Sequence, residues 1–265
     1  MSLIESHFKL HRPPFPQSAE GPSLLHHTTL KEAQERLRFA IERDGIALVT
    51  AESGCGKSTL LGCLCRELDP TAYLVVYSSL STLSPFGLLS SLVAKLGLRS
   101  RRFKGETAQE LIAHLRGLAK GVALILDEAH RMPDESLEDL RLLTADSFEK
   151  KSPFALILAG QPLLRERLTE PQHVALAQRI TVRVRLRSLT DSETTLFLDK
   201  HMRAAGAQRS LFEPDAVTLL FQHSRGIPRL VQNLALNALL AAASANKKNV
   251  DADCVQQALL EAEAP

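Results

Sequence analysis

The sequence predicts an α/β protein in which a parallel sheet with helices on both faces is followed by a small domain that is all helical. Two observations carry this prediction. Short apolar runs alternate with amphipathic stretches of helix length up to about residue 189, which is the pattern of parallel strands buried on both faces. Beyond residue 189 the apolar periodicity is that of helices.

The elements of the α/β part follow in order from these patterns. Strands are expected where an apolar run is continuous or alternates with polar residues, at 45–50, 72–78, 121–127, 154–159 and 180–186. Helices are expected where apolar residues recur at helical spacing, at 28–43, 60–68, 85–97, 107–120, 135–146 and 171–178. The repeated order of strand, helix and strand favours a parallel sheet, because crossover helices connect its strands.

We expect three parts along the chain. Residues 1–23 form a proline-rich N-terminal segment that docks on the body through apolar side chains, residues 24–189 form the α/β core, and residues 190–265 form a helical lid. The lid opens at residues 190–193, where Thr-Asp-Ser-Glu resembles a capping box. Its helices are expected at 191–205, 213–223, 228–245 and 251–262.

Composition narrows the classes of protein. The 32 basic and 30 acidic side chains nearly balance, so any contact with nucleic acid must come from a local patch. No apolar run approaches the length of a membrane span, and the N-terminus lacks an apolar signal core, so we expect a cytoplasmic protein with no membrane contact. The four cysteines have no zinc spacing, and we interpret the nine histidines as surface or loop residues.

A glycine-rich loop follows the first expected strand. Residues 51–59 read Ala-Glu-Ser-Gly-Cys-Gly-Lys-Ser-Thr, which matches a phosphate-binding loop except for alanine at the first glycine position. We expect the loop to tolerate Ala51 if its φ stays below zero. Lys57 can reach the β- and γ-phosphates of a nucleotide, and the Ser58 hydroxyl can bind Mg²⁺. The expected phosphate-binding residues are Gly54, Cys55, Gly56, Lys57, Ser58 and Thr59. The alternative is a glycine turn that precedes a helix without binding a ligand.

Two acidic residues end the apolar strand that begins at Gly121. A carboxylate at the end of a parallel strand beside a phosphate loop can hold Mg²⁺, and the next carboxylate can polarise an attacking water. We therefore expect Asp127 and Ser58 to bind Mg²⁺ and Glu128 to act as the general base. The alternative is that both acids only cap the helix that follows. Together with the loop, they indicate a site that binds phosphates with Mg²⁺ and activates a water.

Several strings along the chain resemble the AAA+ ATPases and, among these, the ExeA-like family. They lie at residues 13–16, 126–130, 138–143, 159–168, 177–181 and 224–230. That family includes a larger secretion ATPase and a short ATPase encoded beside transposases, which is similar to the target-selecting ATPases of Mu-like transposons. The sequence ends at residue 265 without a span or a wall-binding segment, so the resemblance favours the transposition ATPase.

The resemblance implies roles for further residues. Gln161, at the end of a core strand, would sense the γ-phosphate, or it is a simple strand-end amide. Arg179 would reach the nucleotide of a neighbouring subunit, with Arg165 and Arg167 as competing candidates, or it caps a helix C-terminus. Arg229 would reach the γ-phosphate from the lid, or it is a surface arginine.

A dense basic cluster is expected in a loop at residues 98–105. Arg101, Arg102 and Lys104, with Thr107 just beyond, can contact the phosphates of duplex DNA without reading its sequence. The related transposition ATPases use this region and the loop after the second strand on the inner face of helical filaments; here that loop, at 79–84, is hydroxyl-rich and uncharged. The alternative is a solvated basic loop.

These observations favour an ATPase that forms a ring or helical filament of identical subunits on target DNA and delivers this target to a transposase. One alternative is an ExeA-like ATPase of a secretion or envelope-assembly system that acts on protein partners without DNA. Another is a nucleotide-binding regulator with little turnover, which Ala51 leaves open.

Overall fold

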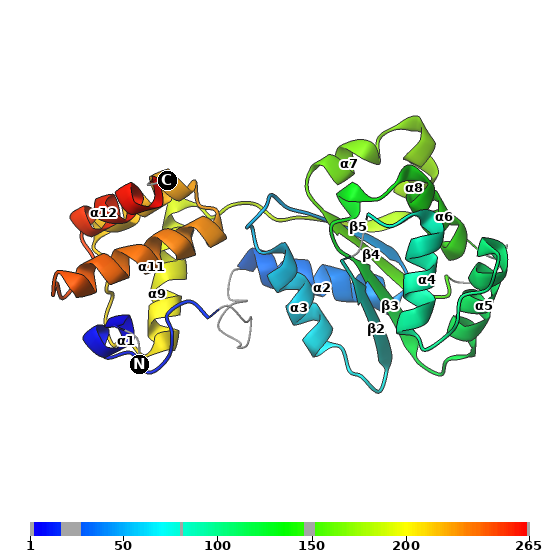
Figure 1. Cartoon of the computed structure of the whole chain (residues 1–265), viewed down its shortest axis with the longest axis horizontal. Coiled ribbons are helices and arrows are strands. Elements are labelled where there is room, and N and C mark those ends of the chain that lie inside the picture. Colours follow the sequence, from blue (N-terminus) through cyan, green and yellow to red (C-terminus); the bar gives the residue numbers. More distant parts are fainter. Residues whose placement is uncertain (1–2, 17–27, 80–81, 146–151, 264–265) are drawn as a thin grey trace. The chain divides into compact units, whose positions relative to one another are not determined.

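The computed structural model describes residues 3–16, 28–79, 82–145 and 152–263. The chain as described divides into two compact units, which are treated separately (Figure 1). An α/β unit spans residues 29–53 and 57–186, and a helical unit spans residues 1–28, 54–56 and 187–265. The expected boundaries at 23/24 and 189/190 stay predictions. The end of the expected N-terminal segment and residues 80–81 of the loop at 79–84 lie outside the described residues.

Among the described residues, five parallel strands form one sheet in the order β2-β3-β4-β1-β5. The strands are β1 (Ile46–Thr50), β2 (Tyr73–Ser78), β3 (Gly121–Leu126), β4 (Ala155–Gly160) and β5 (Ile180–Arg185). This confirms the predicted α/β class. β1, β3 and β4 are buried along nearly their whole length, as continuous apolar runs require. β5, at an edge, alternates buried and exposed residues, which matches its alternating sequence.

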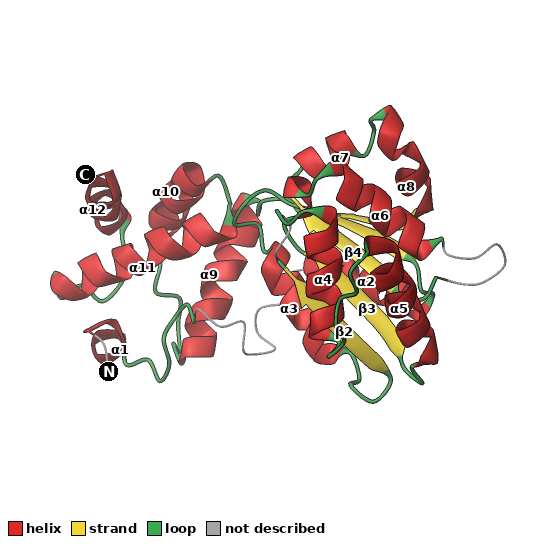
Figure 2. Ribbon diagram, turned by 45° about the vertical axis from the view of Figure 1, so that its right-hand side comes forward, coloured by secondary structure: helices red, strands yellow, loops and turns green. Residues whose placement is uncertain are grey.

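Helices flank this sheet (Figure 2). They are α2 (Thr28–Glu42), α3 (Lys57–Glu67), α4 (Pro85–Lys95), α5 (Lys104–Gly117), α6 (Asp134–Thr144), α7 (Leu163–Arg167) and α8 (Val174–Arg179), with two short 3-10 turns, η1 (Ala129–Arg131) and η2 (Pro171–His173). Alternate residues of β3 and β4 pack with α4, α5 and α6 on one face of the sheet. α5 begins three residues before the expected start, because Lys104 to Glu106 continue the helix and the acidic side chain suits its first turn.

The helical unit contains α1 (Leu3–Phe8), α9 (Asp191–Ala205), α10 (Pro214–Ser224), α11 (Pro228–Ser244) and α12 (Ala252–Glu263). α9 opens with the expected capping box: the Thr190 hydroxyl accepts a bond from the Glu193 N–H, and the Glu193 carboxylate accepts one from the Thr190 N–H. The N-terminal segment packs on this unit, where Ile4 and Leu10 are buried in its core. Sequence periodicity did not predict α1, a helix too short to show a full apolar stripe.

No helix in the described part of the chain is long and apolar enough to cross a membrane.

Three histidines of the described residues are buried, namely His130, His173 and His201, which corrects the expectation that the histidines lie at the surface or in loops. His201, on α9, has its ring 5.0 Å from the Phe15 ring and 4.5 Å from the Phe197 ring, measured between centroids. Burial away from water disfavours the imidazolium and lowers the pKa of His201 to about 4, although a backbone hydrogen bond at Pro14 opposes the shift.

We predict that the helical unit loses stability as the pH falls from about 6.5 to about 4. In the unfolded chain His201 takes up a proton near pH 6.5, whereas in the folded chain it does so only near pH 4, so protons favour unfolding across this window. The loss amounts to roughly 3 kcal/mol once the pH lies below the folded pKa. Urea unfolding followed by circular dichroism at several pH values measures it.

The matched variants are His201→Leu, which removes the buried group, and His223→Leu, which removes an exposed histidine of α10. His201→Leu should flatten the pH dependence of the unfolding free energy, and His223→Leu should leave it as in the wild type. The same slope in the wild type and in His201→Leu would contradict this account.

Candidate active site

The expected site residues lie at the carboxyl ends of three neighbouring strands. The phosphate loop follows β1, Asp127 follows β3 and Gln161 follows β4. β4 lies between β1 and β3, and its register pairs Gly160 with Thr50, the last residue of β1. The strands are parallel, so these three ends meet at one edge of the sheet, which is where open α/β sheets bind ligands.

The backbone of the phosphate loop has the conformation that its glycines predict. Gly54 and Gly56 adopt left-handed φ values of 85° and 88°, which residues with a side chain rarely adopt. Lys57 is the first residue of α3, so the loop leads into a helix N-terminus, which favours anions. Ala51 has no left-handed conformation, and its N–H donates to the Gly160 carbonyl (3.1 Å). Alanine is therefore accommodated as a continuation of the β1–β4 pairing.

Lys57 joins the loop to the acidic strand end. Its side chain is buried, and its ammonium forms ion pairs with Asp127 Oδ1 and with Glu128 Oε1 (2.5 Å). Asp127 is buried as well, whereas the Glu128 side chain keeps 36% of its surface exposed. One cation thus faces two carboxylates that lie about 70 residues away in sequence, so Asp127 and Glu128 do more than cap a helix.

Tyr77 holds the Asp127 carboxylate from the second side. Its hydroxyl donates to Asp127 Oδ2 (3.1 Å), and the Glu128 N–H donates to Oδ1 (2.8 Å). Partial burial and the negative charge of Asp127 raise the pKa of Tyr77 to about 12, so the phenol stays a donor. Sequence reasoning missed Tyr77; the available signal was its place near the end of β2, the neighbour of β3.

The residues around Asp127 fit a Mg²⁺ ion bound together with nucleotide phosphates. The Ser78 hydroxyl, buried at the end of β2, has no hydrogen-bond partner among the described residues, while its carbonyl accepts from the Asp127 N–H (2.8 Å). Ser78 pairs with Leu126 in the register, so its side chain lies on the other face of the sheet from Asp127. The group that suits Mg²⁺ is the Asp127 carboxylate, because Mg²⁺ binds through one or two carboxylates together with substrate phosphates. The described residues hold no cluster of three or more His, Cys, Asp or Glu that could bind a metal ion. The second expected Mg²⁺ ligand, Ser58, is the second residue of α3.

Glu128, the expected base, has an unusual backbone. Its φ of 55° and ψ of 28° lie in the left-handed region, which costs a glutamate about 1–3 kcal/mol and which four other described residues with side chains share. Gln161 is partly buried, and its N–H donates to His130 Nδ1 (3.4 Å). Arg229, the second residue of α11, is exposed in the helical unit. The γ-phosphate roles of Gln161 and Arg229 stay predictions.

The structure reduces the number of arginines that could reach the nucleotide of a neighbouring subunit. The Arg167 guanidinium donates to the His130 carbonyl (2.8 Å) and pairs with Asp134, so it is engaged within its own unit and does not serve as that arginine. Arg165 on α7 and Arg179 at the end of α8 are exposed. These two remain candidates.

The basic cluster is partly neutralised by nearby acids. Arg101 makes two hydrogen bonds to Glu110 (2.6 and 3.1 Å), and Lys104 makes two to Asp139 on α6 (2.8 and 3.0 Å). The Arg102 guanidinium lies 5.5 Å from the centroid of the neighbouring Phe103 ring. Lys104 begins α5 and is not in a loop as expected, so the cluster lies at a helix start.

Thr107 is a correction to the expected DNA-binding set. It is completely buried, its hydroxyl accepts from the Arg101 N–H (2.9 Å), and it donates to the Phe103 carbonyl (3.1 Å). The side chain therefore fixes the turn before α5 and does not reach a phosphate.

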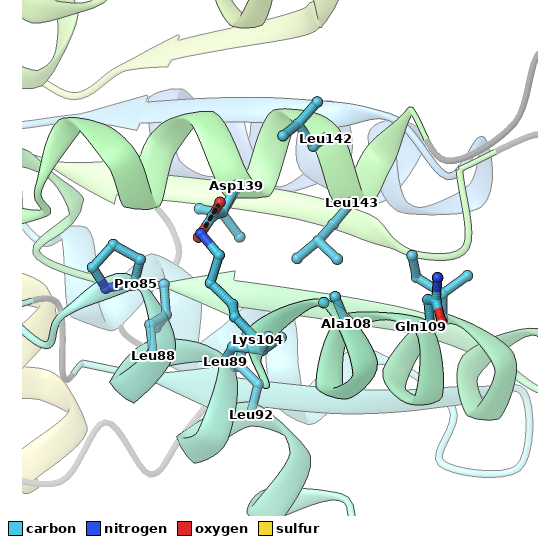
Figure 3. A pocket seen from close by; sticks show the side chains of 13 residues that line it. Pro85, Leu88, Leu89, Leu92, Lys104, Ala108, Gln109, Asp139, Leu142 and Leu143 are labelled. Atoms are coloured by element: carbon cyan, nitrogen blue, oxygen red, sulfur yellow. Dashed lines mark hydrogen bonds and ion pairs between the residues drawn. The ribbon is translucent and has the colours of Figure 1, made fainter. Parts of the chain in front are cut away.

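A cavity of about 240 Å³ lies between α4, α5 and α6 beside this cluster (Figure 3). Its walls are mostly apolar, and the Lys104–Asp139 ion pair bridges α5 and α6 across it. A phosphate that binds Lys104 must therefore compete with Asp139.

Comparison with known proteins places this site in a family. Residues 40–168 match the family model described as an AAA domain. General secretion pathway protein A of Aeromonas hydrophila is 32% identical over 242 residues, which cover 89% of this chain and 44% of that protein. Mu-like prophage FluMu DNA transposition protein B of Haemophilus influenzae is 26% identical over 149 residues, covering 56% of this chain and 49% of that protein. The chain thus spans less than half the length of each of these curated relatives.

A solved structure shares the fold. Cdc6p from Pyrobaculum aerophilum superposes with a TM-score of 0.71 at 18% identity, covering 97% of this chain and 70% of that one. The family match and the fold confirm the predicted ATPase class. Residues 40–168 thus match the AAA domain of ATPases, and the chain is similar to a relative of the ExeA-like kind that its sequence resembles.

Proposed function

We propose that this ATPase binds duplex DNA without sequence preference, oligomerises on it with ATP, and delivers the marked target to a transposase. The ATP-dependent part of the proposal rests on the ion pairs that Lys57 forms with Asp127 and Glu128 at the carboxyl ends of the strands. The similarity to a DNA transposition protein supports the DNA-directed part. The exposed basic cluster at the start of α5 is the surface that we propose for the DNA.

The proposed chemistry assigns one task to each residue. Lys57 and the N-terminus of α3 bind phosphate oxygens, and Ser58 and Asp127 would hold Mg²⁺, which would neutralise phosphate charge. Glu128 orients the attacking water and accepts its proton, a role that suits the more exposed of the two carboxylates. Nucleotide then acts as a switch of the oligomer rather than as the source of chemistry on DNA.

We predict opposite kinetic signatures for two variants of this site. Lys57→Ala should weaken ATP binding more than about tenfold, because the buried cation at the phosphate loop is removed. Glu128→Gln should keep ATP affinity but lower kcat by about 10²–10⁴, because the amide accepts no proton. Binding of a fluorescent ATP analogue and phosphate release measure the two effects.

Glu166→Gln, an exposed acid of α7, is the matched control and should behave as the wild type. Normal hydrolysis by Glu128→Gln would remove this residue from the role of base.

The DNA-directed part is tested by electron microscopy of the protein with random-sequence duplex DNA, with and without ATP and Mg²⁺. Rings or filaments on the DNA that form only with ATP are expected. Absence of DNA association in every nucleotide condition would contradict the proposal. It would favour the alternative of a secretion or envelope-assembly ATPase with protein partners, to which the similarity to General secretion pathway protein A points.

We predict that the basic cluster sets the salt dependence of DNA binding. Replacing Arg101, Arg102 and Lys104 together by alanine should weaken binding. It should also lower the slope of log K against log salt by about one for each DNA phosphate that the variant no longer neutralises. Fluorescence anisotropy with labelled duplex at several salt concentrations measures this slope.

Glu110→Gln is the matched control, because it removes the acid that pairs with Arg101 and leaves every basic side chain in place. It should bind DNA at least as well as the wild type. An unchanged slope in the triple variant would place the DNA surface elsewhere.

A further inference from the structure

His130 links the candidate base to the end of β4, and sequence reasoning assigned it no role. It lies in η1, two residues beyond Glu128, and only 9% of its surface is exposed. A buried histidine is expected to have its ring nitrogens satisfied, so the partners of each nitrogen indicate what the residue does.

The two ring nitrogens face different elements. Nδ1 accepts the N–H of Gln161, just beyond β4 (3.4 Å). A neutral imidazole with Nδ1 as the acceptor carries its proton on Nε2. Nε2 lies 3.8 Å from Glu128 Oε2, so a donor group faces the carboxylate. Burial lowers the pKa of His130, and the charge of Lys57 adds to this, although Glu128 opposes it; the ring is therefore neutral near pH 7.

His130 is held from two sides. Arg167 donates to the His130 carbonyl (2.8 Å) and is itself paired with Asp134, to which the buried His173 also bonds (3.0 Å). On the other side, a methyl group added at Gly160 would lie 3.0 Å from the backbone nitrogen of His130 and 3.3 Å from its ring nitrogen Nδ1. The ring thus packs against the bare backbone at the end of β4.

The two oxygens of Glu128 have different partners. Oε1 pairs with Lys57, the residue expected to bind phosphates, whereas Oε2 faces His130. At 3.8 Å the second contact is longer than a hydrogen bond, and a small rotation of the Glu128 side chain would shorten it. The strained backbone of Glu128 also calls for contacts that hold it in place.

We propose that His130 is a positioning residue whose Nε2–H orients the Glu128 carboxylate and ties it to the backbone at the end of β4, beside Gln161. The inference rests on the proposed role of Glu128 as base. A displacement of the β4 end on nucleotide binding would then be passed to the base through one imidazole ring.

Two variants separate the contact of Nε2 with Glu128 from the contact of Nδ1 with Gln161. In His130→Gln the amide nitrogen can take the place of Nε2 and keep a donor toward Glu128. In His130→Asn the amide oxygen can take the place of Nδ1 and keep the Gln161 contact, but no donor faces Glu128. We expect His130→Asn to lower kcat about 10–100-fold at unchanged ATP affinity, and His130→Gln to restore most of that loss.

The measurements are kcat, affinity for a fluorescent ATP analogue and melting temperature, for both variants and for Glu128→Gln with and without His130→Asn. If His130 acts through Glu128, the double variant should be no slower than Glu128→Gln alone. A wild-type kcat in His130→Asn, or an equal loss of kcat and melting temperature in both His130 variants, would overturn the inference while leaving the base assignment standing. Normal hydrolysis in Glu128→Gln would instead show that the proposed base, and with it this inference, is wrong.

Discussion

The ion pairs of buried Lys57 with Asp127 and Glu128 are the interaction on which the rest of the α/β unit depends. Charges removed from water destabilise a fold unless they are paired closely. That pairing requires β1 and β3 to end at the same edge, separated only by β4, and it requires α3 to begin where the loop ends. Strand order, register and helix start are thus all constrained by one cation and two carboxylates.

The polar groups around this centre form a continuous set that crosses several elements. Tyr77 reaches Asp127 from β2, and His130 connects the segment after β3 to the end of β4. Arg167 anchors His130 from α7. Tyr77, His130 and Arg167 each have a partner on another element, which restricts how far one strand end can move without the others. A ligand shifts the equilibrium between two conformations only by its difference in affinity for them. Strand ends that move together would provide two such conformations for a nucleotide switch.

The basic cluster differs from a simple exposed patch. Two of its charges, on Arg101 and Lys104, are paired with Glu110 and Asp139, so a polyanion bound there would exchange internal ion pairs for external ones. Exposed ion pairs of this kind stabilise a protein only slightly, so the exchange costs little free energy. The cluster also borders α4 and α6 through the cavity between them, so its geometry is set by helix packing as well as by its own sequence.

The sequence by itself determined the strands and most helices of the α/β part, the capping box, and the ends of strands where the chemistry lies. These features are encoded locally, in apolar periods, glycine positions and adjacent acids. Only the tertiary structure decided the roles of Tyr77 and Arg167 and the burial of Thr107 and His130. Tyr77 lies 50 residues from Asp127, and Arg167 lies 37 from His130. No local pattern carries contacts over such separations, because they arise only when parallel strands bring their ends to one edge.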